Sequence, residues 1–388
     1  MAIANPYNGS VTTQWYVKEV EPGVTPDNPV WTQLQLTGGA PLVTKEALIS
    51  AQLGGGGEVN AIRLADQDLA GEFSAELAYA AYDDLLESAM SNTWVAGVDQ
   101  AGVEITVDST LKTFTRSTGD FVSDGVRVND YIVFPDLTGQ NGKAFVVSAV
   151  DATTVTGASI ALELADETVT TDYKTSDQLT QGGLCETIST MIWFKGSCGA
   201  ADAFMIFTGV KMTGYTVEAA INSFITSTFP FLGDRGEIVD APPAGSTYLP
   251  IDALSVDKFS SADGRIMDGN DIVGFMDSET ITNDTASSKN KYLGGTSSIN
   301  RGLISNTLSI SGKLNSLSYV QRYFDETPLK VSLAMEFGGR LLAFSHNNAK
   351  ITNAGYAIDA PEDATQNIEA QAIGDANNSS IVVHRLSY

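Results

Sequence analysis

Carboxylates are the residues of this 388-residue chain that are most able to do chemistry. Asp and Glu number 47 against 22 Lys and Arg, which gives a net charge of −25. Glycoside hydrolysis needs two carboxylates placed across a cleft, but among so many acids the sequence singles out no such pair. The Asp-rich stretch 263–274 lacks the spacing of a calcium loop. The run Gly54 to Gly57 lacks the Lys and helix start of a phosphate-binding loop, so it indicates a turn at a sheet edge.

Thiols and imidazoles are sparse. Cys185 and Cys198 lack CxxC spacing, and His346 and His384 lie far from them in the sequence. Two cysteines in so long a chain favour buried or half-buried thiols over a disulfide framework or a zinc site. The sequence also has neither a nucleophile elbow nor an HExxH pair. We therefore predict that the protein is not an enzyme and holds no metal and no cofactor.

The composition predicts a globular protein of two or three domains. Apolar residues make up 43% of the chain, enough to fill cores of ordinary size. The acidic surface repels nucleic acid and anionic membranes, which fits either simple solubility or a surface that passes nucleic acid without binding it. We see no secretory signal and no apolar run of about 20 residues, so we expect a soluble protein without a membrane segment, made in a cytoplasm.

One structural unit is present twice. An LGG motif begins at Leu53 and again at Leu293, and each is followed by alternating segments around a glycine, Gly71 or Gly312. A second pair of similar segments begins at Lys211 and Lys350. The first pair is offset by about 240 residues and the second by about 140, so the first copy is expected to carry an insertion of about 100 residues.

The patterns predict mostly strands. Apolar and polar residues alternate at 62–64 and 73–77, which is typical of half-buried antiparallel strands, and the stretch 64–71 is expected to form a turn between them. Helical spacing predicts one short helix at 79–91 and another at 316–327.

We therefore predict a mainly β fold with two tandem β-sandwich or barrel domains, each with a short helix, and an inserted small β-barrel or Ig-like domain. The expected boundaries are an N-terminal arm at 1–40, a first domain at 41–96 and 182–232, the inserted domain at 97–181, a linker at 233–265 and a second domain at 266–388. Proline excludes helix from the arm, which carries Trp15 and Trp31. These side chains are expected to contact a neighbouring subunit, or else to tuck against their own domain.

The segments EPGVTPDNPVWTQLQLTGG, VTKEALIS, IRLADQDLAGEFSAELAYAAYDDLLESAM and FTGVKMTGYTVEAAINSFITSTFPFLG follow one another in an order that resembles the tail tube proteins of long-tailed, siphovirus-type bacteriophages. The block from Leu69 to Leu86 is the most specific part. The segment 121–157 resembles a small β-domain often inserted in these proteins. The resemblance covers most of the chain, and the internal repeat extends it over 233–388.

The resemblance implies a structural virion protein with two packed β-sheets flanked by a helix. Subunits would close into rings, and rings would stack into a tube through which DNA leaves the capsid. Two tube domains per chain imply homotrimeric rings that are nearly six-fold. The partners implied are the chain itself and the tape measure, tail tip and terminator proteins, with assembly in the host bacterial cytoplasm and a final place in the virion tail. DNA would pass without specific binding, because carboxylates repel phosphate.

The acidic strand faces are the expected lining of the channel. The lumen-facing candidates are Asp66, Asp68, Glu72, Glu76 and Glu218. Matching positions in the second copy are less acidic, namely Asn306, Ser309 and Lys313. The inserted domain is expected to project away from the channel and to be dispensable for assembly. The alternative is another β-sandwich virion protein, such as a decoration, baseplate or glycan-binding tail component.

Overall fold

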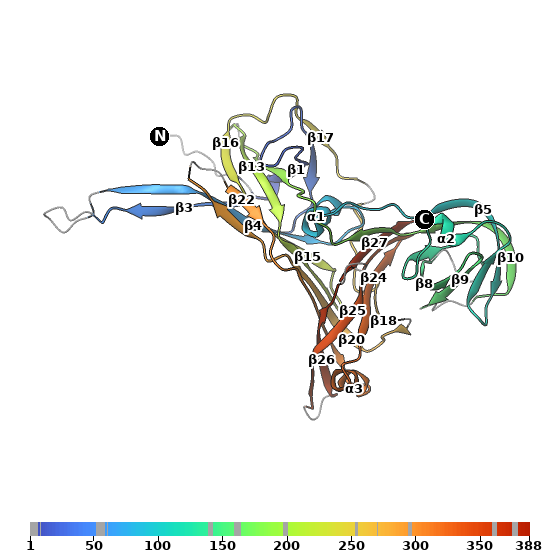
Figure 1. The fold of residues 1–388 in the computed structure, drawn as a ribbon. Coiled ribbons are helices and arrows are strands. Elements are labelled where there is room, and N and C mark those ends of the chain that lie inside the picture. Colours follow the sequence, from blue (N-terminus) through green and yellow to red (C-terminus); the bar gives the residue numbers. More distant parts are fainter. Residues whose placement is uncertain are drawn as a thin grey trace.

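The computed structural model confirms a mainly β fold (Figure 1). It describes residues 7, 9–51, 59, 61–138, 143–158, 164–196, 201–252, 255–269, 271–293, 297–358, 363–374 and 379–388. The expected turn at Gly54 to Gly57 and the thiol of Cys198 lie outside these ranges. Among the described residues, no helix is long and apolar enough to cross a membrane.

The largest element is an antiparallel sheet of eight neighbouring strands. Their order is β3 (Leu42–Ile49), β4 (Ile62–Glu76), β15 (Thr226–Gly233), β14 (Gly214–Ala220), β20 (Met276–Asp284), β23 (Ser305–Lys313), β26 (Thr365–Ala372) and β25 (Arg340–Ala357). The first four strands and the last four follow one pattern. In each group, the first two neighbours come early in the chain and in chain order, and the next two come later in the chain and in reverse order. We call β3-β4-β15-β14 the first strand set and β20-β23-β26-β25 the second.

A second layer packs on the first strand set. Its order is β17 (Thr247–Leu249), β2 (Val30–Leu34), β1 (Thr13–Lys18), β12 (Ile188–Phe194), β13 (Ala203–Met212) and β16 (Arg235–Val239). The expected arm therefore supplies two strands, and the expected linker supplies β16, β17 and the start of β18 (Gly264–Asp268). The prolines of both segments fall outside these strands.

The layer behind the second strand set is covered on both faces. It contains β18, β19 (Asp271–Ile272), β24 (Leu329–Phe337), the first half of β25, β27 (Val382–Ser387) and β11 (Asp177–Thr180). Leu342 and Phe344 of β25 face the main core, while Leu341 and Ala343 pack in a separate cluster with the small barrel described next. Such double burial explains the unbroken apolar run at 341–344.

The small barrel is closed and has six strands. It is formed by β5 (Asp99–Asp108), β6 (Thr113–Arg116), β9 (Thr154–Ala158), β8 (Phe145–Val150), β7 (Tyr131–Val133) and β10 (Glu167–Thr175), with the one-turn helix α2 (Phe121–Asp124). It falls in the range 97–181 for which a small β-domain was expected. However, β11, within that range, pairs with β27 and not with the barrel.

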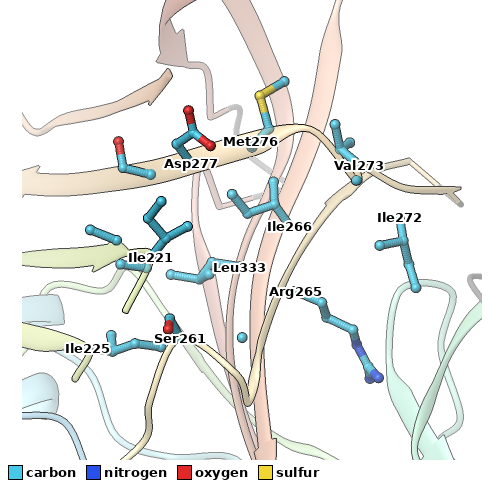
Figure 2. A pocket seen from close by; sticks show the side chains of 15 residues that line it. Ile221, Ile225, Ser261, Arg265, Ile266, Ile272, Val273, Met276, Asp277 and Leu333 are labelled. Atoms are coloured by element: carbon cyan, nitrogen blue, oxygen red, sulfur yellow. The ribbon is translucent and has the colours of Figure 1, made fainter. Parts of the chain in front are cut away.

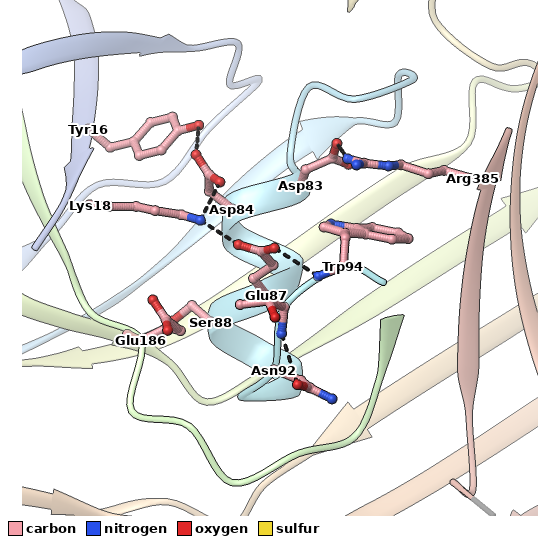
Figure 3. Close-up of polar contacts among 11 residues, drawn as sticks. Tyr16, Lys18, Asp83, Asp84, Glu87, Ser88, Asn92, Trp94, Glu186 and Arg385 are labelled. Carbon is pink, nitrogen blue, oxygen red and sulfur yellow. Dashed lines mark hydrogen bonds and ion pairs between the residues drawn. The ribbon is translucent and has the colours of Figure 1, made fainter. Parts of the chain in front are cut away.

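The two expected helices are present and shorter than predicted. They are α1 (Asp83–Met90) and α3 (Ser318–Phe324). Figure 3 shows how charged side chains of α1 contact β1 of the second layer and β27 of the layer behind the second strand set. Asp84 accepts from the Tyr16 hydroxyl at 2.8 Å and lies 2.8 Å from Lys18 Nζ, and Asp83 pairs with Arg385 of β27. Burial raises the pKa of Asp83 to about 6 in spite of the Arg385 guanidinium.

The expected turn at 64–71 is wrong, because β4 runs through it without a break. Gly71 serves close packing instead of a turn: a Cβ there would lie 2.7 Å from the carbonyl oxygen of Ala40. Gly312 of β23 plays the same part, since a Cβ there would collide with the carbonyl oxygen of Phe275. The two glycines of the sequence repeat thus permit a close approach of the residues just before the first strand of each strand set, β3 or β20.

Candidate functional site

One face of the eight-stranded sheet is polar from β4 to β25, and we call it the polar face. Along residues 69–76 of β4, residues 278–284 of β20, and the whole of β23 and β26, exposed or half-buried residues alternate with buried ones, so each segment turns one set of side chains to the core and the other to solvent. The solvent-facing set includes Asp66, Asp68, Glu72, Ser74, Glu76, Thr226, Thr228, Thr216, Glu218, Ser278, Thr280, Thr282, Asp284, Ser305, Thr307, Ser309, Ser311, Lys313, Asn367, Glu369, Gln371, Lys350 and Asn353.

The strand registers align these side chains in cross-strand rows. One row runs from β4 to β25 through Glu76, Thr226, Glu218, Thr280, Ser309, Glu369 and Asn353. The next runs through Ser74, Thr228, Thr216, Thr282, Thr307, Gln371 and Lys350. Each row crosses both strand sets, so the polar face is one continuous surface.

Hydroxyls and carboxylates dominate the polar face. Seven acids lie on it, namely Asp66, Asp68, Glu72, Glu76, Glu218, Asp284 and Glu369, against Lys313 and Lys350. Lys291, from outside the face, lies 3.3 Å from Asp68 in an exposed ion pair. Nothing in this arrangement pairs a nucleophile with a base. Within the described ranges, no group of three or more His, Cys, Asp or Glu side chains could hold a metal ion. The chemistry this face offers is hydration and the repulsion of anions.

All five acids selected from the sequence lie on the polar face. Glu76 and Glu218 share a row, although they come from distant parts of the chain. Ser309 and Lys313 of the second strand set also lie on this face, whereas Asn306 does not. Asn306 is buried on the core side, where its amide bonds Asn283 and Ser380 at 2.6 Å. A difference of one residue in register turns a side chain to the opposite face of a strand.

The serines and threonines of the polar face were missed from the sequence. They come from β4, β14, β15, β20 and β23, whose segments alternate hydroxyl residues with apolar ones, as in TSTFPF of β15 and SNTLSIS of β23. That alternation is a readable signal of one solvated face. The partner of each strand depends on pairings between distant segments, so the rows themselves have no local signature.

Trp15 and Trp31 are not free to contact a neighbour. Trp31 is 0% exposed within the single chain, and its ring nitrogen donates to Ser246 Oγ at 3.1 Å. Trp15 is also buried and meets the Tyr248 ring edge to face at 5.0 Å. The inter-subunit role expected of both residues is therefore wrong, and the alternative of an arm tucked against its own domain holds.

The core side of the same sheet holds an unusual acid. Glu279 of β20 is 0% exposed, and neither of its carboxylate oxygens has a hydrogen-bond partner among the described residues. Burial raises the pKa of Glu279 to about 8. A protonated carboxyl group at neutral pH avoids the cost of a buried, unpaired charge.

An apolar cavity of about 260 Å³ lies at one end of the sheet (Figure 2). Ile221 and Ile225 reach it from the turn between β14 and β15. Ile266 of β18, Met276 of β20 and Leu333 of β24 line the other side. Arg265 points out of it toward the barrel, where it meets Glu336 at 3.0 Å and the carbonyl oxygen of Ala144 at 3.2 Å. The cavity thus lies between the β14–β15 turn and strands β18, β20 and β24, and its lining presents no cluster of catalytic groups.

Comparison with known proteins gives a family match over almost the whole chain. The model of a family described as phage tail tube protein matches residues 9–372. No curated protein matches this sequence. Two solved structures with partial similarity are the virion of a native gene transfer agent particle and the tail of an empty gene transfer agent particle with C6 symmetry. For each, the identity is 17%, the TM-score is 0.26, and the match covers 30% of this chain and 95% of that chain. A TM-score this low supports no structural inference.

Proposed function

The chain belongs to the phage tail tube protein family, and we propose that three copies close into a ring by joining their eight-stranded sheets edge to edge, with the polar face lining the channel. As a member of this family, the protein is a structural component of the tail that assembles into a tube with other tail proteins. The family match gives no support to the alternative of a decoration, baseplate or glycan-binding component.

The joint between the two strand sets carries this proposal. Strands β14 and β20 pair antiparallel over seven residue pairs, from Gly214 with Asp284 to Ala220 with Ser278. β14 is the last strand of the first set and β20 is the first strand of the second. The corresponding strands at the outer margins are β25 and β3. In the described chain, β3 pairs only with β4, and residues 350–357 of β25 pair only with β26.

The open edges β25 and β3 correspond to β14 and β20, which pair within the chain, so β25 and β3 of successive copies can pair in the same way and close a ring. Pairing β25 of one copy with β3 of the next would repeat the β14–β20 joint between chains. The interaction is head-to-tail, so it closes only if the rotation per copy divides a full turn. Closure would also remove two exposed strand edges that otherwise invite aggregation.

The repeat supports three copies per ring. Each chain supplies two strand sets, so three chains supply six, in a three-fold ring with six similar lobes. Image analysis of purified tubes tests this directly: rings of three chains with pseudo-six-fold density are expected, whereas six full chains per ring would overturn the stoichiometry.

The polar face suits a conduit for DNA. Its carboxylates would repel phosphate, and its hydroxyls would hold water, so DNA would pass without specific binding. Screening limits the reach of each charge to about 8–10 Å at physiological salt. The lining would therefore act as a dense ring and not through single residues. Tape measure, tail tip and terminator proteins are the proposed partners, with assembly in the host bacterial cytoplasm.

A further inference from the structure

Each strand set carries a hairpin extension, and the two extensions differ in the single chain. In the second set, the hairpin β21 (Ser288–Lys291) and β22 (Ser297–Asn300) arises between β20 and β23, and we call it the second arm. In the first set, the outer parts of β3 and β4, residues 46–51 and 61–66, form the first arm between the corresponding strands. The first arm projects freely from the body, whereas the second lies close to β4 (Figure 1).

The second arm is docked on the first strand set of its own chain. Lys289 Nζ donates to the carbonyl oxygens of Gly233 and Asp234, both at 2.7 Å. Ser297 Oγ donates to Asp234 Oδ1 at 2.5 Å, and Lys291 lies 3.3 Å from Asp68. The second arm therefore leans back across β14 onto the end of β15 and the adjacent part of β4, which are the inner strands of the preceding strand set.

The first arm has an apolar surface with nothing on it. Ile49, Ile62 and Leu64 lie on one face of this hairpin, and each is more than half exposed. Paired strands that expose several large apolar side chains are a hazard unless another surface covers them.

The correspondence between the strand sets identifies that surface. If β3 of one copy joins β25 of its neighbour as β20 joins β14, the first arm should lean back across β25. It would then meet the end of β26 and the start of β23 in the neighbour. Two exposed apolar side chains lie there, Leu303, which is 89% exposed, and Ile373, which is 40% exposed. The register that pairs Thr307 with Gln371 brings Ile373 to the level of Ser305, two residues from Leu303.

We propose that the first arm of each copy docks on the patch formed by Leu303 and Ile373 of the neighbouring copy in the same ring. This inference rests on the proposed joining of β25 to β3. The contact is the inter-chain counterpart of the docking that the second arm makes within the chain. In this inter-chain contact, apolar side chains take the place of the polar contacts that Lys289 and Ser297 make within the chain. We call the contact a clasp, because it joins neighbouring copies within one ring and does not link successive rings.

Cross-linking of assembled tubes tests the proposal. In a background with Cys185→Ser and Cys198→Ser, the variant carrying Ile49→Cys and Leu303→Cys is assembled and treated with a short bis-maleimide. Its chains are then separated under denaturing conditions. A clasp within a three-chain ring gives linked products that end at three chains. Variants with only one of the two new cysteines provide the matched control and should give no linked series beyond two chains.

The other outcomes separate the two proposals. A series that ends at six chains keeps the clasp and overturns the three-chain ring. A series of cross-linked products that continues beyond six chains means that the first arm links successive rings. Tubes without cross-linked chains mean that the first arm docks elsewhere. Either result overturns the clasp. Hydrogen exchange on the unmodified protein gives a second test that needs no variant. Amides at 46–49 and 301–304 should both become slower to exchange on assembly, and unchanged exchange at 301–304 would also overturn the clasp.

Discussion

Glu76 of β4 and Glu218 of β14 lie in one row of the polar face, with only Thr226 of β15 between them. Glu72 lies on the same face of β4. If this face lines the channel, changing Glu72, Glu76 and Glu218 to Lys places three cations per chain along the DNA. We expect tubes to form and DNA ejection from virions to slow, most strongly at low salt, because salt screens the attraction.

A matched control places the same charge change elsewhere. Glu104 and Asp136 are exposed on the small barrel, and Asp240 is exposed just after β16. Changing these three acids to Lys should leave ejection unaffected at every salt concentration. Equal ejection kinetics for both triple variants at low salt would show that the polar face does not meet the DNA.

The small barrel should be needed for stability, contrary to the expectation that it is dispensable. On the outer layer it covers Met267, Leu341 and Leu386, which pack with Tyr131 and other barrel side chains. Deleting residues 99–175 with a Gly/Ser bridge exposes these three side chains, at a cost of about 5 kcal/mol. We expect thermal unfolding at a lower temperature and aggregation.

The same deletion with Leu341→Thr and Leu386→Thr provides the control. If exposed apolar area is the cause, the added hydroxyls should restore a soluble chain, as measured by size-exclusion chromatography. A simple deletion variant that unfolds at the temperature of the full chain would contradict this account.

Local patterns predicted the elements, and distant pairings limited the rest. Both helices followed from helical spacing, and Glu72 and Glu76 followed from alternation along one strand. Asp66 and Asp68 lie in the stretch that was expected to be a turn. The turn at 64–71 was wrong because Gly71, read as a turn residue, instead makes room for the carbonyl of Ala40. Trp15 and Trp31 were expected at an interface because their segment was interpreted as an arm, whereas its two strands pair with each other and with the distant strands β12 and β17.

The ion pair between Asp83 and Arg385 should hold helix α1 to strand β27. Arg385 also bonds Asp177 at 2.9 Å and lies 4.5 Å from the centre of the Trp94 ring. Arg385→Ala leaves the half-buried Asp83 without its cation, and we expect the free energy of unfolding to fall by about 2 kcal/mol. Denaturant titration of the unassembled chain measures it.

A double-mutant cycle and an exposed pair control this prediction. Adding Asp83→Asn to Arg385→Ala should recover part of the loss, because the unpaired charge is then gone. Lys350→Ala breaks an exposed pair with Glu326 at 3.0 Å and should cost less than about 1 kcal/mol. Equal losses of stability for Arg385→Ala and Lys350→Ala would show that the half-buried Asp83–Arg385 pair contributes no more than an exposed pair.

Glu279 should make the stability of the chain depend on pH between about 4.5 and 8. Burial raises its pKa from the usual 4.5 to about 8, so the folded state keeps a proton that the unfolded state loses. Stability from this group is complete below pH 4.5, falls by about 1.4 kcal/mol per pH unit as the pH rises, and levels off above 8. Glu279→Gln removes this loss, so its stability relative to the natural chain should grow from pH 5 to 8. Urea unfolding of the unassembled protein measures the difference, with the solvent-facing Glu218→Gln as a control that should show no such trend. A difference for Glu279→Gln that stays constant across this range would mean that the carboxyl group titrates normally and is not held in the core.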